Sequence, residues 1–493
     1  MNFLHYLASK KTEYLINIVL FAAGTTCVII GGNKVTSIFA YFSFGFFYLL
    51  IRRLELLESF IVGFFAGVIF GNASFNWLAV FADITPYYMA VFFNGFLLAI
   101  IFTLSALLFR RFPKSLFVHL FSFGFILFII RAGFHYSPVL PYAKAFLTYI
   151  NNPTVFDWLT PYLGSSVIDV LVLATGCLFA QIWIEHKKGR LPSQLIGFII
   201  FFLAIALING AQSLQNDSTT NREVVRVALL QGNFSWDWGD RVERTDETFE
   251  YYSNQTLLAA AKGAKIVVWP EYTIPKDILH ADKAILEKLE ALSRKTGAAL
   301  VVGAMEIIDS TKSNDYKNKY DLSVVIDPEK LLLEPYRAVR PIFTQTVAGT
   351  KKVIFSTQNS SFPIISCFEV ADHRFVLEYL SKEVTSVDFL IGIANIQIFE
   401  NNEGTTRIAN HIRRLTMESG KYFVYVSNTG PSFVLDPQGK FKLNLPISQQ
   451  STQLYDVPKI KEASFYSKYQ DVPLLLMFII GFGFVILKSR NNR

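Results

Sequence analysis

The stretch Ala264-Lys-Ile-Val-Val-Trp-Pro-Glu271 is a short apolar run that ends in a carboxylate. A second stretch, Phe362-Pro-Ile-Ile-Ser-Cys-Phe-Glu369, has the same form and carries a cysteine near its end. Apolar runs of this length, rich in Val and Ile, are typical of buried strands. The end of a strand, where the chain turns, is a usual place to present a reactive side chain.

Similar β-rich segments recur between residues 213 and 470, among them VVRVALLQ, AALVVGAME, VDFLIGIAN and YFVYVSN. They alternate with helical stretches at 281–296 and 405–420. This rhythm is typical of an α/β domain. We therefore expect one globular α/β domain over residues 222–456.

Long apolar runs flank this domain on both sides in the sequence. A transmembrane helix needs about 20 mostly apolar residues. Seven such runs precede the domain and one follows it, at 14–31, 35–51, 59–82, 88–109, 115–130, 165–184, 195–212 and 471–487. The sequence thus predicts a membrane protein with a seven-helix bundle over 1–212, an external α/β domain, and one C-terminal transmembrane helix over 471–488.

Composition and charge agree with this plan. Of the 493 residues, 52% are hydrophobic and 17% are charged, below the 25% or so of soluble domains. This excludes a disordered chain, a basic nucleic-acid-binding protein and a purely cytosolic enzyme. Lys and Arg gather in alternate connections, while the opposite connections hold Lys34, Arg131 and Lys144. Because cytoplasmic loops carry the basic excess, we expect both termini in the cytoplasm and the α/β domain in the periplasm of a bacterial inner membrane.

Polar residues inside the apolar runs have two interpretations. They line a substrate cavity, or they form hydrogen bonds between helices; we favour the second. The residues concerned are Asn72, Asn76, Asn94, His119 and Asp169.

The long outer connection at 132–164 is rich in Pro and aromatic residues. Trp and Tyr prefer the membrane interface. We expect this segment to form an interfacial lid at the depth of the lipid headgroups.

Taken singly, the candidate reactive residues are ambiguous. A lone strand cysteine such as Cys367 is more often a packed hydrophobe than a nucleophile. Glu271 either caps a following helix or acts as a general base that Trp269 partly desolvates. His411, with the arginines near it, favours a polar helix face. Three cysteines without paired spacing exclude a disulfide framework and a zinc site.

Taken together and in order, the motifs are more specific. The chain resembles the nitrilase superfamily, and most closely its membrane-bound branch, the bacterial apolipoprotein N-acyltransferases. The resemblance rests on Val227-Ala-Leu-Leu-Gln-Gly-Asn233, VVWPE at 267–271, Cys367-Phe-Glu369, the run from Asn395 to Ser427-Asn-Thr-Gly430, and Phe465-Tyr-Ser-Lys-Tyr-Gln-Asp471.

The resemblance implies an αββα sandwich with a Cys–Lys–Glu triad. Carried over, Cys367 is the nucleophile, Glu271 the general base and Glu369 a supporting residue. The substrate-binding residues that we expect are Trp236, Trp238, Phe368 and Asn395, although the two tryptophans also fit interface anchors or core. No metal or nucleotide cofactor is expected, because the sequence has no glycine-rich phosphate loop and no cluster of metal ligands.

The triad lysine departs from the family pattern. Tyr336 is recognisable, but an ungapped alignment places Ala338 at the lysine position, and a shift of one residue places Arg337 there. Arg337 replaces the lysine, or Lys351 or Lys352 reaches in from a nearby loop, or the site is degenerate. Arg can stabilise an oxyanion but cannot release a proton.

The function that the resemblance implies is acyl transfer between lipids. Cys367 takes an acyl chain from a phospholipid as a thioester, and the α-amine of a diacylglyceryl-cysteine lipoprotein then accepts it. Two alternatives remain open: a membrane-tethered amidase that uses water, and a catalytically silent protein that binds lipid or lipoprotein.

Overall fold

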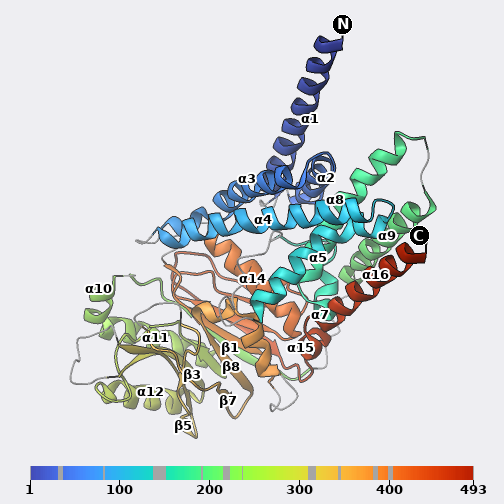
Figure 1. Cartoon of the computed structure of the whole chain (residues 1–493). Helices are drawn as coiled ribbons and strands as arrows, with labels where there is room; N and C mark the ends of the chain where they lie inside the picture. Colours follow the sequence, from blue (N-terminus) through green and yellow to red (C-terminus); the bar gives the residue numbers. More distant parts are fainter. Residues whose placement is uncertain are drawn as a thin grey trace. The chain divides into compact units, whose positions relative to one another are not determined.

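The computed structural model describes residues 2–31, 37–80, 84–136, 152–189, 192–214, 222–235, 237–308, 318–341, 346–380, 387–397 and 403–491. The chain forms two compact units. One comprises Met1–Asn216 with Tyr469–Arg493 and is helical; the other, Asp217–Lys468, contains the strands (Figure 1).

Apolar helices make up the first unit. Six of the described helices are long and apolar enough to cross a membrane, and the apolar segments Ser37–Ile51 and Leu195–Ile205 are shorter. The bounds are α1 (Asn2–Gly31), α2 (Ala40–Ile51), α3 (Leu56–Phe75), α4 (Thr85–Arg111), α5 (Leu116–His135), α7 (Thr160–Leu163), α8 (Ser166–His186), α9 (Ser193–Leu214) and α16 (Val472–Asn491). Each of the eight predicted apolar runs overlaps one of these helices.

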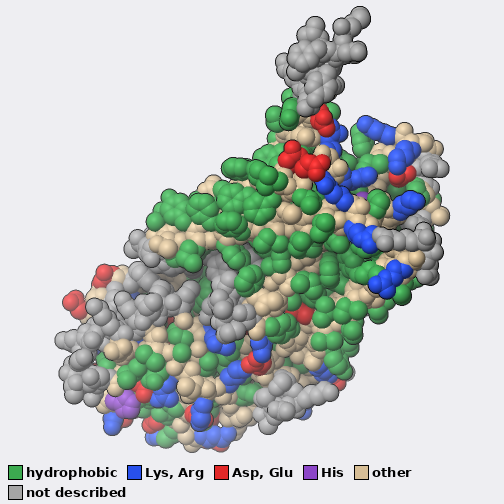
Figure 2. Space-filling model, in the orientation of Figure 1, with side chains coloured by type: hydrophobic (Ala, Val, Ile, Leu, Met, Phe, Trp, Pro, Cys, Tyr) green, Lys and Arg blue, Asp and Glu red, His purple; other side chains and the backbone are tan. Residues whose placement is uncertain are grey.

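The surface over α3 and α4 is dominated by hydrophobic side chains (Figure 2). An apolar exterior of this kind suits contact with lipid rather than water. The exposed residues there include Leu57, Ile61, Phe65, Met89, Phe92, Phe96 and Leu107.

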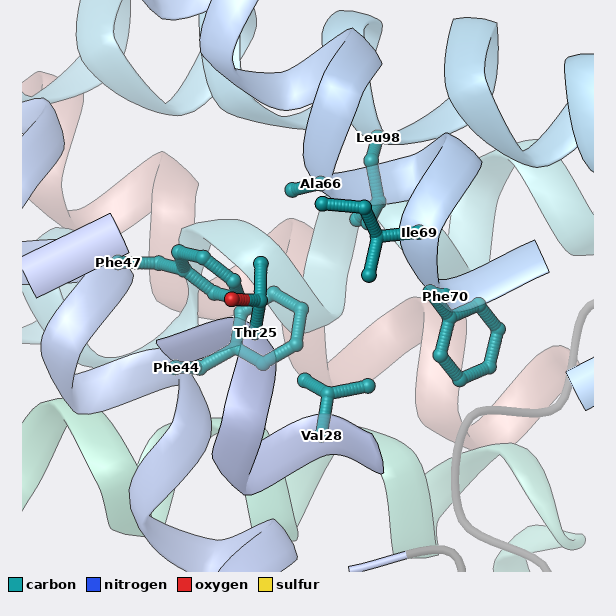
Figure 3. A pocket seen from close by; sticks show the side chains of 8 residues that line it. All are labelled: Thr25, Val28, Phe44, Phe47, Ala66, Ile69, Phe70 and Leu98. Atoms are coloured by element: carbon teal, nitrogen blue, oxygen red, sulfur yellow. The ribbon is translucent and has the colours of Figure 1, made fainter. Parts of the chain in front are cut away.

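Close backbone packing joins α3 to α4. Gly63, Gly67 and Gly71 recur at four-residue spacing on α3, and a Cβ on Gly67 would collide with the carbonyl oxygen of Asn94. Small residues at this spacing let membrane helices approach closely. A small apolar hollow lies beside this contact (Figure 3), lined by Thr25, Val28, Phe44, Phe47, Ala66, Ile69, Phe70 and Leu98.

Three of the polar residues singled out in the apolar runs bond to a neighbouring helix, whereas the Asn94 amide donates to the carbonyl oxygen of Ala90 in its own helix. The Tyr48 hydroxyl lies 3.0 Å from Nδ1 of His119, and Asp169 forms a buried ion pair with Arg131. Tyr87 donates to Asn72. The preferred interpretation, hydrogen bonds between helices, is confirmed for these three residues.

The expectation that Arg131 lies in an outer connection is wrong: Arg131 is buried inside α5 and is paired with Asp169. Much of the predicted lid at 132–164 falls in residues 137–151, outside the described residues. Within its described part, Trp158 Nε1 donates to the carbonyl oxygen of Ile205 at 3.0 Å, so this indole is tied to α9.

Two sheets form the second unit. Parallel strands lie at the centre of each, and antiparallel strands at the edges. The first sheet has the order β13 (Ser451–Pro458), β1 (Val224–Gln231), β2 (Ile266–Val268), β3 (Ala299–Ile307), β4 (Lys319–Asp327), β5 (Leu331–Leu332), and β6 (Tyr336–Arg337) also pairs with β4. The second has the order β12 (Phe441–Asn444), β11 (Phe433–Leu435), β10 (Phe423–Ser427), β9 (Leu390–Ala394), β8 (Ser361–Ser366), β7 (Ile354–Ser356).

Helices α11 and α12 pack against the first sheet and lie beside β3 in Figure 1. The helices of this unit are α10 (Trp238–Glu243), α11 (Thr245–Ala261), α12 (Lys283–Thr296), α13 (His373–Leu377) and α14 (Glu403–Ser419), with η5 (Cys367–Ala371) and η6 (Glu378–Leu380) as short 3₁₀ turns and α15 (Phe465–Tyr469) at its end.

Each face of the first sheet packs into a separate core. Val227 and Leu229 of β1 join the core shared with the second sheet. Ala228 and Leu230 join the core shared with α11 and α12. Side chains alternate between the faces of a strand, so this sheet is apolar on both faces, as the continuous hydrophobic runs predict.

The polar face expected on α14 is buried rather than solvated. Arg414 and Glu418 are buried, and the Glu418 carboxylate lies 2.5 Å from Nδ1 of His373. The His373 and His411 rings lie 4.2 Å apart. These groups form a polar network beneath η5, because buried charges persist only where they are paired.

Candidate active site

Three strand ends converge on one site. Glu271 follows β2, Cys367 directly follows β8, and Asn395 directly follows β9. The backbone N–H of Asn395 donates to Oε2 of Glu271 at 2.7 Å. The Cys367 thiol is hydrogen-bonded to Glu271 and contacts the same N–H of Asn395. The structure therefore brings together three of the residues expected at the site.

The backbone at Cys367 is strained. Its φ is +45°, in the left-handed region, where a residue other than glycine stores about 1–3 kcal/mol. The strand stops at Ser366, and Glu369 and Ser366 form a reciprocal capping box at the start of η5. A sharp turn between strand and helix holds the thiol away from the strand.

Glu271 is buried, and its close neighbours explain how it is placed. Gly303 on β3 faces the Pro270–Glu271 segment, where a Cβ would collide with the carbonyl oxygen of Pro270. Trp269 is fully buried and donates from Nε1 to Thr256 at 3.0 Å. The helix-cap interpretation of Glu271 is wrong, because the next helix, α12, begins only at Lys283.

A second buried carboxyl group meets Glu271. Asp321 on β4 is hydrogen-bonded to Glu271, and its Oδ2 accepts from the Ser366 hydroxyl at 2.6 Å. Two carboxyl groups can bond only if a proton lies between them. Burial raises the pKa of Glu271, and its neighbour Asp321 raises it further; burial also raises the pKa of Asp321. The hydrogen bond between the two carboxyl groups therefore requires that the pair share one proton.

The thiol is held protonated in the resting site. Burial, followed by the negative charge of Glu271, raises the pKa of Cys367 well above its usual range. Because the thiolate is the reactive form, a base must take the proton as the sulfur attacks. Glu271 is hydrogen-bonded to that proton and is placed to accept it.

A lysine that sequence reasoning missed lies beside these carboxyl groups. Lys319 begins β4 and is only 8% exposed, and its Nζ lies 4.8 Å from the Tyr272 ring centroid. Burial lowers the pKa of Lys319 to about 8, while Asp321 and Glu271 oppose that shift. The sequence carries only a partial signal: Lys319 and Asp321 stand two apart at the start of an apolar run, and residues two apart in a strand share one face.

Glu369 organises the turn rather than the reaction. Its carboxylate accepts from the Tyr336 hydroxyl at 2.7 Å and from the backbone N–H groups of Val339, Arg340 and Ser366 at 2.7, 3.1 and 2.8 Å. Burial raises the pKa of Glu369 to about 7, although these donors oppose the shift. Glu369 thus joins the loop after β6 to the residue that precedes Cys367.

A cavity of about 290 Å³ is lined in part by Ile396 and Gln397, the two residues that follow Asn395. The Asn395 side chain is buried, and neither of its amide atoms has a hydrogen-bond partner in the described part of the chain. Phe368 is half-buried next to the thiol. Trp236 and the side chain of Trp238 lie outside the described residues. The cavity is lined by Asn233, Ile396, Gln397, Thr405, Thr429, Gly430, Ile447 and Ser448.

Comparison with known proteins shows what the chain is similar to. Residues 226–459 match the carbon-nitrogen hydrolase family model. Apolipoprotein N-acyltransferase of Wigglesworthia glossinidia brevipalpis is 26% identical over 370 residues, which cover 69% of this chain and 70% of that protein. The one from Aquifex aeolicus is 26% identical over 434 residues, covering 79% and 95%. The chain is therefore similar to the apolipoprotein N-acyltransferases, and its strand-containing unit matches the carbon-nitrogen hydrolase family.

A solved structure is also similar. An amidase from Nesterenkonia sp. is 15% identical, and the match covers 50% of this chain and 94% of the amidase with a TM-score of 0.39.

The lysine expected from the resemblance is the feature that the sequence left open. The structure does not bring Arg337 to the thiol: its guanidinium is paired with Glu306 and lies over the Tyr320 ring. Lys351 is paired with Glu334 at 2.6 Å and its side chain is 75% exposed. Lys352 is paired with Glu378. The contacts of these three side chains in the described structure are with groups away from Cys367.

Proposed function

We propose that the chain transfers an acyl group from a phospholipid to the α-amine of a diacylglyceryl-cysteine lipoprotein. The observation that carries this proposal is the thiol of Cys367 at a strained turn, hydrogen-bonded to a buried glutamate. A thiol and base in this arrangement suit acyl transfer through a thioester. The family relationship and the apolar helices support lipid substrates.

The proposal includes the layout in the membrane. A bundle of seven helices over 1–212 and one helix over 471–488 flank an αββα sandwich over 222–456. Both termini lie in the cytoplasm and the sandwich lies in the periplasm, beside the bacterial inner membrane. The basic residues of alternate connections support this orientation.

The first half-reaction forms the thioester. Cys367 Sγ attacks the carbonyl carbon of a phospholipid ester, and its proton passes to Glu271. The resulting tetrahedral intermediate carries one negative charge on oxygen. Its collapse breaks the ester C–O bond, and the departing alkoxide takes the proton from Glu271. A lysophospholipid leaves, and the acyl group stays on Sγ.

The second half-reaction transfers the acyl group to nitrogen. The neutral α-amine of the lipoprotein cysteine attacks the thioester carbon and gives a proton to Glu271. The C–S bond breaks, and the thiolate of Cys367 recovers that proton. The products are an amide and the resting thiol, so Glu271 acts as base and then as acid in each half.

Substrate binding falls to groups around the thiol. We assign Asn395 and Phe368 to positioning the reacting carbonyl, because both directly adjoin the thiol or its base. Trp236 and Trp238 remain proposed contacts for acyl chains. The cavity beyond Asn395 is polar at Asn233, Gln397 and Thr405, which suits a headgroup or peptide rather than an acyl chain.

A transfer assay tests this function. The full chain in liposomes, with a phospholipid that carries an odd-numbered acyl chain, should add that acyl group to a synthetic diacylglyceryl-cysteine lipopeptide. An N-acetylated lipopeptide should gain no mass, because its amine is blocked. Release of free fatty acid without transfer would support the amidase alternative, and neither product would support the silent-binder alternative; each result contradicts the proposal.

A further inference from the structure

We propose that Lys319, on β4, supplies the positive charge of this active site in place of a lysine near position 338. The inference rests on the proposed acyl transfer and adds one catalytic group to it. Its place in the reaction is beside the carbonyl oxygen of the bound ester. There the ammonium would stabilise the charge that develops on that oxygen.

Strand alternation places Lys319 on the inner face of the first sheet. Residues two apart on a strand share a face. Val325 of β4 belongs to the core between the sheets, whereas Leu322 belongs to the core beside α11 and α12. Lys319 and Asp321 are in phase with Val325, so both point toward the second sheet, from which Cys367 comes. The Asp321 contacts with Glu271 and Ser366 confirm that direction.

The same register turns Arg337 away. On β6, Arg337 is opposite Leu322 and Tyr336 is opposite Ser323. Directly paired residues of an antiparallel pair share a face, so Arg337 follows Leu322 to the outer face. There it forms its ion pair with Glu306. Tyr336 follows Ser323 to the inner face, where it contacts Glu369.

Position 338 faces inward but carries no charge. Ala338 is buried, and its N–H donates to the carbonyl oxygen of Asp321 at 2.9 Å. Ala338 is thus cross-strand to Asp321 and shares its face, at the position where the family pattern has a lysine. Lys319, two residues from Asp321 on the same face, provides an ammonium to this neighbourhood from the adjacent strand.

The charge of the carboxyl pair also favours a cation here. The pair of Glu271 and Asp321 with one proton has a charge of −1, which the ammonium of Lys319 neutralises. When the thiol proton moves to the pair, the pair becomes neutral and the negative charge appears on the substrate oxygen. The negative charge thus moves from the carboxyl pair to the substrate oxygen, and the attraction of Lys319 is redirected to the transition state, as catalysis requires.

A second cation, Arg241, also lies near these groups, and its hydrogen bond gives it a different role. Its guanidinium donates to the carbonyl oxygen of Tyr272, directly after Glu271. This bond holds the backbone of the base in place. We therefore regard Arg241 as a positioning residue and Lys319 as the group that meets substrate.

The test compares Lys319→Met with Arg337→Met in the full chain, using the rate at which phospholipid acylates the thiol. We expect Lys319→Met to slow acylation about 100-fold, since removing one oxyanion donor costs about 10²–10³ in rate. Arg337→Met should stay within about threefold. Thermal unfolding of each variant in detergent checks folding, and Ala338→Lys added to Lys319→Met should restore part of the rate.

The pH profile supplies a readout that a structural role would not move. Lys319 is charged below its pKa of about 8, so wild-type acylation should decline as the pH rises through that value. The charged and titratable groups around it are Asp321, Glu271, Arg241 and Tyr272. Lys319→Arg keeps its charge above pH 10 and should shift the alkaline decline upward.

The outcomes separate this inference from the function on which it rests. If the wild-type chain forms no acyl-enzyme, the proposed function fails. If the wild type forms it and Lys319→Met matches that rate, or Arg337→Met shows the larger loss, the assignment to Lys319 is overturned while the function stands. An unchanged alkaline limb in Lys319→Arg also overturns it.

Discussion

Replacing Glu271 with Gln is expected to reduce the acylation of Cys367 by about 10²–10⁴-fold, the usual contribution of a positioned general base. The amide keeps the size of the side chain but cannot accept the thiol proton. Since burial and Glu271 together keep that thiol protonated, the attacking thiolate would have no base to generate it. Rapid mixing with phospholipid vesicles, quenching at set times and intact mass measurement together give the acylation rate.

Glu334→Gln is the matched control for this variant. Glu334 is half-exposed and is paired with Lys351 on the surface, where such a pair contributes about 0–1 kcal/mol. Its acylation rate should match the wild type. Acylation of Glu271→Gln at more than a tenth of the wild-type rate would remove Glu271 from the role of base.

Of the substitutions considered, Glu369→Gln should lower the free energy of unfolding the most. The carboxylate accepts from the Tyr336 hydroxyl and three backbone N–H groups. The amide directs an NH₂ group at some of those donors, so buried N–H groups lose their acceptor. We expect a loss of about 2–4 kcal/mol, because each unsatisfied buried group costs about 1–3 kcal/mol. In thermal unfolding of the full chain, the apparent Tm should fall by about 5–15 °C.

Glu378→Gln tests whether the loss of stability in Glu369→Gln comes from the burial of that carboxylate. Glu378 is paired with Lys352 and Arg374, but its side chain is 39% exposed. We expect its Tm to change by no more than about 3 °C, since exposed ion pairs contribute little. A similar fall in Tm for both variants would show that the buried hydrogen bonds of Glu369 contribute no more to stability than an exposed ion pair does.

The sequence predicted the strand ends well because that signal is local. Each of the runs before Glu271, Cys367 and Asn395 combines β-branched residues with an abrupt polar end. The parallel strands β8 and β9 bring the ends at Cys367 and Asn395 to one edge of the second sheet. The apolar helices were equally clear, since length and composition suffice to recognise them. The buried contacts of Asp169 and Arg131 were less clear, because a charge inside a helix looks the same as one at its end.

The cation of the active site was harder to predict, because the strand register decides which basic side chain faces the site. Alignment by motif points to Ala338 or Arg337, and a shift of one residue exchanges the two faces of a strand. Only the pairing of β6 with β4 shows that Arg337 faces outward. Lys319 lies on a different strand from the motif, so its approach to Glu271 is a tertiary contact that no local pattern contains.

The intact mass of the purified chain after incubation with phospholipid tests the central claim most directly. The wild type should gain the mass of one acyl chain, and hydroxylamine should remove it, as expected of a thioester. Cys367→Ala should gain none while still binding phospholipid. An adduct that persists in Cys367→Ala, or no wild-type adduct where phospholipid binds and lipopeptide is acylated, would contradict the account.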